Sequence, residues 1–163
     1  MESLKPLDKI STPDGRWEAF HIDLETLYKI TKAMSLSEDV PKYPAIQFQQ
    51  AQHLLIYSHL QFSLLSVALT QAVIAVECAI KTRWRNSPSG LKKSPYGLKK
   101  LLEHAFREKW IEGFSQNLIN ILPTLRNASA HGQYTLDPIG TLELVKLCGE
   151  VIQQLFSPPS KCL

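Results

Sequence analysis

The residues best suited to chemistry lie together in the segment 125–132, which reads Leu-Arg-Asn-Ala-Ser-Ala-His-Gly. Arg126 brings a permanent positive charge and a planar set of donors that match phosphate oxygens. His131 brings an imidazole whose ordinary pKa of about 6.5 lets it move protons near neutral pH. Asn127 adds an amide between the two. We interpret these three residues as a candidate catalytic site for a reaction at phosphate.

The five-residue separation of Arg126 and His131 determines whether the two side chains can meet. Residues five apart lie about 140° apart around a helix axis, so Arg126 and His131 do not share a face if the helix simply continues. Gly132 favours a break, because glycine readily adopts the left-handed conformation of a helix C-cap. We therefore expect His131 at or just beyond a helix end. The sequence leaves open whether the two side chains converge within one protomer or only across a dimer.

The same spacing occurs a second time, at Arg16 and His21. There the arginine is followed by Trp17 and the histidine by Ile22, so neither the polar residue nor the glycine is present. We interpret this second pair as a coincidence of spacing.

A family resemblance follows from the first pair. Arg126-Asn127-x-x-x-His131, between two helical segments of a small all-helical chain, resembles the R-x(4–6)-H motif of the HEPN (higher eukaryotes and prokaryotes nucleotide-binding) superfamily. Upstream, the segment 75–83, with Glu77 before Lys81 and Arg83, resembles the acidic-then-basic end of the long core helix in such domains. The resemblance covers residues 46–157 and leaves 1–45 as an appendage and linker and 158–163 as a tail.

The chemistry expected of such a site is metal-independent RNA cleavage without a cofactor. The 2′-hydroxyl of RNA is the nucleophile, so the enzyme supplies proton transfer and a cation, and the products are a 2′,3′-cyclic phosphate and a 5′-hydroxyl. His131 would transfer protons, Arg126 would stabilise the charge on phosphorus, and Asn127 would orient the phosphate or a neighbouring side chain. A single histidine would have to act both as the general base and as the general acid. The resemblance implies a homodimer, in which two copies of the motif form one composite site.

Other roles stay open at this point. Glu77 could support the site by a hydrogen bond to the active-site arginine in a dimer, or it could merely pair with Lys81 one helical turn later. The fold would also suit a non-catalytic HEPN-like module that binds RNA, a nucleotide or a partner protein. A third hypothesis is a toxin or defence effector that is inhibited by an antitoxin or regulatory protein.

A strip of positive charge supports RNA as the partner. Residues 81–109 carry nine bases and two acids, a net charge of +7, whereas 1–80 sum to −3 and 110–163 to −1. Trp84, Tyr96 and Trp110 are interspersed, which suits binding to a phosphate backbone. The alternative is an ordinary solvated face. The candidate RNA-binding residues are Lys81, Arg83, Arg85, Lys92, Lys93, Lys99 and Lys100.

Composition excludes several other classes. The sequence contains no Gly-rich phosphate loop, H-E-x-x-H, G-x-S-x-G or metal-spaced cluster of ligands. The three scattered cysteines lack a C-x-x-C pair, and the N-terminus lacks an apolar signal region, which favours a reducing cytoplasm. The uncharged run 43–76 contains many Gln and His residues, and its most apolar stretch, 62–76, is shorter than a membrane span needs.

Apolar spacing predicts an all-α fold, a HEPN-like bundle of about four to five core helices with an N-terminal helical appendage. We expect one helix over 16–34, a linker over 35–44, a long spine over 46–85 with a break near 58–59, and helices over 96–110, 116–130 and 137–156. Pro123 should bend its helix or start a fresh turn. Val67 and Ile74 lie off the main apolar face of the spine, so we expect that helix to be buried on most sides, and Ile121 and Ile139 are expected to face inward.

Overall fold

The computed structural model describes residues 4–88, 97–113, 117–130 and 137–157, and every regular element within these ranges is a helix. This confirms the all-α prediction for the described part of the chain. The two short 3₁₀ helices span Leu7–Lys9 and Gly15–Phe20. The α-helices are α1 (Leu24–Lys32), α2 (Lys42–Tyr57), α3 (Leu64–Arg85), α4 (Leu98–Arg107), α5 (Leu118–Ala130) and α6 (Pro138–Phe156).

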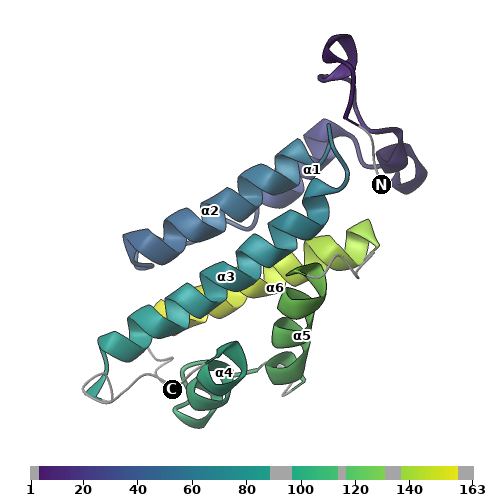
Figure 1. Ribbon diagram of the computed structural model, residues 1–163. Helices are drawn as coiled ribbons and strands as arrows, with labels where there is room; N and C mark the ends of the chain where they lie inside the picture. The colour runs from purple at the N-terminus through teal and green to yellow at the C-terminus, as the bar shows by residue number, and fades with distance from the viewer. Residues whose placement is uncertain (1–3, 89–96, 114–116, 131–136, 158–163) are drawn as a thin grey trace.

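Helix α3 forms the centre of the bundle. It packs most extensively against α2 and α6, and α4 and α5 contact its C-terminal half (Figure 1). Small side chains at Ala68, Ala72 and Ala79 are fully buried and let the neighbouring helices approach closely. Gly149 in α6 has a similar role, because a Cβ atom there would lie 2.8 Å from Cζ of Phe48 in α2. The three long helices therefore share one closely packed core.

The length and composition of α3 raise the question of a membrane span. Among the described residues it is the one helix that is long and apolar enough to cross a bilayer, with a mean hydropathy of 1.7 over its most apolar window. Half of that window is buried inside the bundle. By this criterion alone the evidence for a span is weak.

The predicted break in the spine is confirmed, and the linker before it is shorter than predicted. Helix α2 ends at Tyr57 and α3 begins at Leu64. Helix α2 already begins at Lys42, inside the linker predicted over 35–44. Pro44 lies in the first turn of α2, where a missing N–H group removes no helical hydrogen bond.

The single helix predicted over 16–34 is wrong. The second 3₁₀ helix ends at Phe20, the next residue His21 adopts a left-handed conformation with φ of 53°, and α1 starts only after Asp23. The side chain of Asp23 accepts a hydrogen bond from the backbone N–H of Thr26 at 2.8 Å and so caps α1. A left-handed residue and a new cap interrupt the periodicity that the apolar residues alone suggested.

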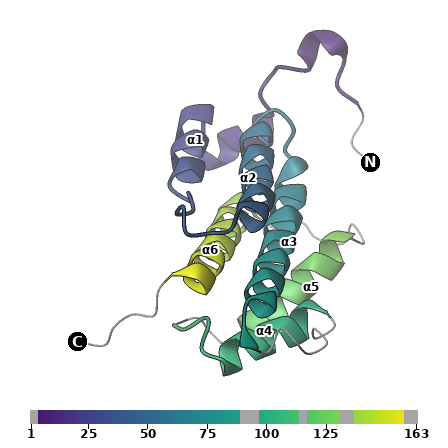
Figure 2. The ribbon, with the colours of Figure 1, turned by 90° about the vertical axis from the view of Figure 1, so that its left-hand side faces the viewer.

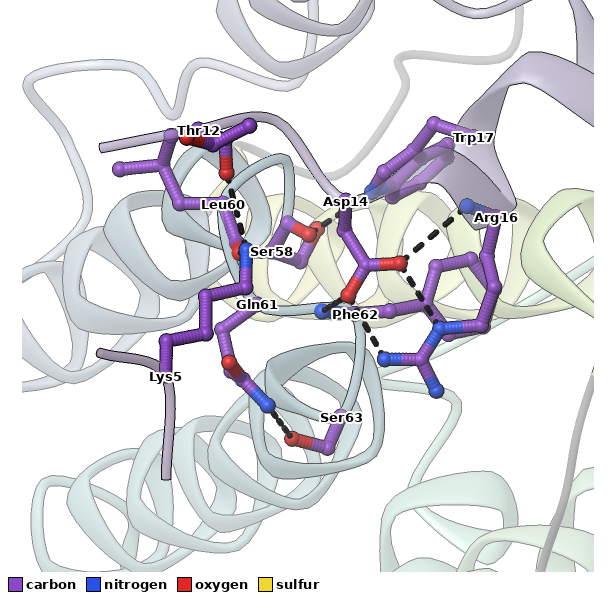
Figure 3. A network of polar contacts seen from close by, with 10 residues as sticks. All are labelled: Lys5, Thr12, Asp14, Arg16, Trp17, Ser58, Leu60, Gln61, Phe62 and Ser63. Carbon is purple, nitrogen blue, oxygen red and sulfur yellow. Dashed lines mark hydrogen bonds and ion pairs between the residues drawn. The ribbon is translucent and has the colours of Figure 1, made fainter. Parts of the chain in front are cut away.

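A polar network fastens the N-terminal segment to the α2–α3 turn (Figure 3). Asp14 accepts hydrogen bonds from Arg16 Nη2 at 2.7 Å, Arg16 Nε at 2.8 Å and the backbone N–H of Phe62 at 3.1 Å. Trp17 Nε1 donates to the carbonyl of Ser58 at 2.7 Å. The Arg16 side chain holds the pKa of Asp14 far below its usual range. We call Asp14, Arg16, Trp17, Ser58 and Phe62 the N-terminal clamp.

The clamp places the N-terminal segment against the main bundle. Trp17 is 1% exposed, and its ring meets the ring of Phe62 edge-on at 5.3 Å. Leu27 of α1 is fully buried in the same hydrophobic core as α2, α3 and α6, and α1 lies beside α2 in both views (Figure 2). The division of the chain at residue 45 remains a prediction.

Four apolar residues are more exposed than predicted. Val67 and Ile74 are 47% and 37% exposed, so α3 has one side that its neighbours do not cover. Ile121 and Ile139 were expected inside but are 43% and 50% exposed. In α5 the buried apolar positions are Leu118, Ile119, Leu122 and Leu125, and the helix packs against α3 and α4.

The last three helices follow the prediction in outline. Helix α4 is shorter than 96–110, since it ends at Arg107 and Lys109 turns left-handed with φ of 55°. Helix α5 is continuous through Pro123, so no fresh turn begins there. Helix α6 is capped as expected, with Asp137 Oδ1 accepting from the N–H of Gly140 at 2.9 Å and Pro138 in the first turn.

Candidate active site

Helix α5 presents Arg126 and Asn127 at the surface. Buried Leu122 and Leu125 hold the helix against its neighbours, and Arg126 lies at the edge of this contact, where it reaches Glu77 of α3. The Arg126 side chain is 45% exposed, and Asn127 is also exposed. Both residues are therefore positioned by a packed helix and remain accessible to a ligand.

Glu77 of α3 brings two cations together. Its Oε1 lies 2.6 Å from Nζ of Lys81, and its Oε2 lies 3.7 Å from Nη2 of Arg126. Of the two roles that the sequence left open, Glu77 has the pairing with Lys81, and its contact with Arg126 is an ion pair without a hydrogen bond. We call Glu77, Lys81 and Arg126 the charge triad. Two positive groups meet one negative group, which leaves a net positive charge for an incoming anion.

The two ion pairs of the triad differ in strength. The 2.6 Å contact of Lys81 is a charge-assisted hydrogen bond, whereas 3.7 Å is too long for a hydrogen bond from Arg126. The Glu77 side chain is only 14% exposed and is therefore held in place by its surroundings, while the Lys81 side chain is 42% exposed. The guanidinium of Arg126 therefore lies near a carboxylate without its donors being committed to it.

The triad lies beside the uncovered side of α3. Val67, Ile74 and Lys81 follow one another at intervals of seven residues, which places them in one line along the helix. Glu77 lies about 60° from this line, on the flank that carries its contact with α5. A partly apolar and partly basic surface therefore adjoins Arg126.

Three of the predicted site residues lie outside the described residues. These are His131, Lys92 and Lys93. The convergence of His131 with Arg126 therefore stays a prediction.

The remaining candidate RNA-binding residues are at the surface. Arg83 and Arg85 are exposed at the end of α3, and Lys99 and Lys100 are exposed in the first turns of α4. Helix α4 lies at the end of the molecule where α3 terminates (Figure 1). The described members of the basic strip are thus gathered at one end of the bundle.

Sequence reasoning missed a ring cluster at this end. His104 of α4 is 4% exposed and lies between Trp84 and Trp110, with ring centres 4.3 and 5.0 Å away. Its Nδ1 lies 2.8 Å from Nη2 of Arg107 and therefore accepts a hydrogen bond. Burial lowers the pKa of His104, and Arg107 adds to this, although Glu108 acts in the opposite direction. Histidine three residues before an arginine on an amphipathic helix is the sequence signal that could have pointed to it.

The described residues offer little for other chemistry. Burial raises the pKa of the Cys78 thiol, and it raises that of Cys148 to about 12, so neither is an activated nucleophile. Within the described ranges, no group of three or more His, Cys, Asp or Glu side chains is placed to hold a metal ion. The charge triad remains the arrangement best suited to an anionic ligand.

Comparison of the chain with protein-family models, with curated proteins and with solved structures gives no match. The resemblance to the HEPN superfamily, the homodimer, the regulatory partner and the cytoplasmic location therefore remain predictions.

Proposed function

We propose that the protein is a metal-independent endoribonuclease whose site combines the charge triad with Asn127 and His131. The observation that carries the proposal is the meeting of Arg126 and Lys81 at the one carboxylate of Glu77. Arg126 lies close enough to be oriented by this carboxylate and far enough to bind a phosphate as well. The arrangement supports a site for a phosphodiester, in which negative charge increases during reaction.

The reaction follows from the groups available. His131 takes the proton of the 2′-hydroxyl, the 2′-oxygen bonds to phosphorus, and the bond from phosphorus to the 5′-oxygen breaks. The leaving oxygen receives a proton, and the products are a 2′,3′-cyclic phosphate and a 5′-hydroxyl. Arg126 and Lys81 stabilise the extra charge on the phosphate oxygens, and Asn127 orients the phosphate. Because Arg126 and Lys81 already lie beside Glu77, these side chains need little rearrangement as negative charge develops on the phosphate.

A homodimer would supply a second imidazole. One histidine acts as base, and His131 of the partner subunit acts as acid, when two sites share one interface. The uncovered side of α3, with Val67 and Ile74 exposed next to the triad, supports this arrangement because apolar surface favours association. Light scattering should then give twice the monomer mass, and Val67→Lys should lower both the mass and the cleavage rate.

The decisive experiment is incubation of labelled RNA with the purified protein in EDTA, beside Arg126→Ala and His131→Ala variants. We expect cleavage to cyclic-phosphate ends by the wild type and a loss of at least about a hundredfold in each variant. An oligonucleotide with 2′-deoxyribose at every position should remain intact. Equal cleavage by all three proteins would place the activity elsewhere.

A non-catalytic RNA-binding module is the second candidate, and one observation favours it. Arg83, Arg85, Lys99 and Lys100 are exposed at one end of the bundle whether or not the triad is catalytic. This candidate predicts RNA binding that weakens with salt and no product in the same assay. Turnover therefore separates the two functions.

A further inference from the structure

Trp110 occupies an unusual position at the basic end of the bundle. It follows α4, is only partly buried, and packs against His104, whose ring lies 5.0 Å away and almost perpendicular at 83°. His104 in turn packs on Trp84, which is 7% exposed. The indole of Trp110 is thus backed by the buried ring of His104, which packs on Trp84 in turn, while part of the indole remains at the surface.

Arg83 lies over the indole of Trp110. The guanidinium carbon is 5.8 Å from the ring centre, within the range of a cation–π contact. A base that stacks on both groups needs about twice a contact distance, roughly 7–8 Å, between the guanidinium and the ring, so Arg83 has to move outward by about 1–2 Å. Arg83 is exposed and can move outward by a small distance. A planar ligand could then enter between the guanidinium and the indole.

We propose that Arg83 and Trp110 bind one unpaired nucleobase of single-stranded RNA, at a subsite separate from the cleavage motif. This inference rests on the proposed function in taking RNA as the ligand. A nucleobase stacks on an aromatic ring and on an arginine plane, and the exposed Lys99 and Lys100 supply charge for its flanking phosphates. In double-stranded RNA the bases are stacked on one another and are unavailable for such a sandwich.

The subsite does not coincide with the charge triad. Arg83 lies six residues after Glu77, which corresponds to about 9 Å along α3 and about 120° around its axis. A base held at Trp110 is therefore not the one whose phosphate reaches Arg126. The subsite selects unpaired RNA and contributes to its binding without contact with the reacting atoms.

The test compares two RNAs of equal length and charge. One is a single-stranded oligouridylate, and the other has the same ribose-phosphate backbone without bases. Fluorescence anisotropy gives the dissociation constants, and all titrations use the full chain with His131→Ala, so that the RNA is not cut. Trp110→Leu removes the aromatic face and keeps apolar packing, and Arg83→Lys keeps the charge and removes the planar group. Lys100→Ala is the matched control, because it removes one exposed charge and no stacking surface.

We expect Trp110→Leu to weaken binding of the oligouridylate about fivefold or more and to leave the base-free RNA unaffected. Arg83→Lys should show the same selectivity with a smaller loss, and it cannot be attributed to misfolding because Arg83 is exposed. Lys100→Ala should weaken both RNAs equally. Equal losses for both RNAs with Arg83→Lys, or no loss with either variant, would overturn the subsite.

The outcome is independent of the proposed cleavage. Base-dependent binding through Trp110 without any turnover by the wild type would leave the subsite standing and remove the ribonuclease. Cleavage by the wild type, together with equal effects of the variants on both RNAs, would support the ribonuclease and overturn the subsite.

Discussion

Two arginines in this chain have a histidine five positions later, and the structure gives them opposite surroundings. Arg16 is bound by Asp14 through two hydrogen bonds of 2.7 and 2.8 Å, and its guanidinium lies 4.6 Å from the ring centre of Phe62. Arg126 has the 3.7 Å ion pair with Glu77, and this carboxylate already holds Lys81. The first arginine is a structural part of the clamp, and the second retains capacity for a ligand.

The difference lies in the acid and not in the arginine. Asp14 is two residues from Arg16 and 9% exposed in its side chain, so its charge is committed to one partner and to the backbone of Phe62. Glu77 reaches Arg126 from another helix and divides its two oxygens between two cations. Identical spacing between arginine and histidine therefore does not identify a site, and the arrangement of neighbouring charges is more informative.

The largest expected effect is on RNA cleavage. Arg126→Ala and His131→Ala should each lower the rate at least about a hundredfold, because charge stabilisation and proton transfer are lost. His21→Ala, which changes the histidine of the other pair, should retain the wild-type rate per folded molecule. Quantified cyclic-phosphate product, normalised to folded protein by circular dichroism, gives the comparison. A similar loss in His21→Ala would contradict our distinction between the two pairs.

The next largest effect is on stability. Here a substitution in the N-terminal clamp should have the larger effect and one in the charge triad the smaller. Asp14→Ala should lower the free energy of unfolding by about 2–3 kcal/mol, because Arg16 and the N–H of Phe62 both lose their acceptor in a mostly buried position. Glu77→Ala should cost under about 1 kcal/mol, since both partners are partly exposed and can turn to water when the carboxylate is removed. Urea unfolding followed by circular dichroism measures both values. If the two variants lost equal stability, the clamp would not be the more firmly bound region.

The smallest effect is on how the free energy of unfolding depends on pH, and it should differ between variants of His104 and of Asp14. The folded state lowers the pKa of His104, so the unfolded chain binds a proton first as the pH falls through about 6.5, and stability decreases. The pKa of Asp14 is also lowered, and its stabilisation is present above about pH 4 and lost only below it. Between pH 7.5 and 5.5 the wild type should lose under about 1.4 kcal/mol per unit. His104→Gln should flatten this slope, and Asp14→Asn should not.

Much of the fold could be predicted because the signals are local. The break between α2 and α3, the Asp137 cap with Pro138, and the end of α6 at Phe156 all follow from residues within one or two turns. The prediction failed where a local feature replaced the expected one, as at His21, whose left-handed backbone ends the 3₁₀ helix. It also failed where burial depends on neighbours, as for Val67 and Ile139, which no helix covers.

The sequence by itself determined the helical class, the order of the helices from α2 to α6 and the chemistry available, because apolar period, capping residues and residue types are properties of short segments. Only the tertiary structure decided which charges meet. Glu77 reaches both Lys81 and Arg126 because α5 packs beside α3, and Trp110 is backed by His104, which packs on Trp84, because α4 packs at the end of α3. Such contacts join residues far apart in the chain, and their distances depend on helix packing, which residue spacing does not encode.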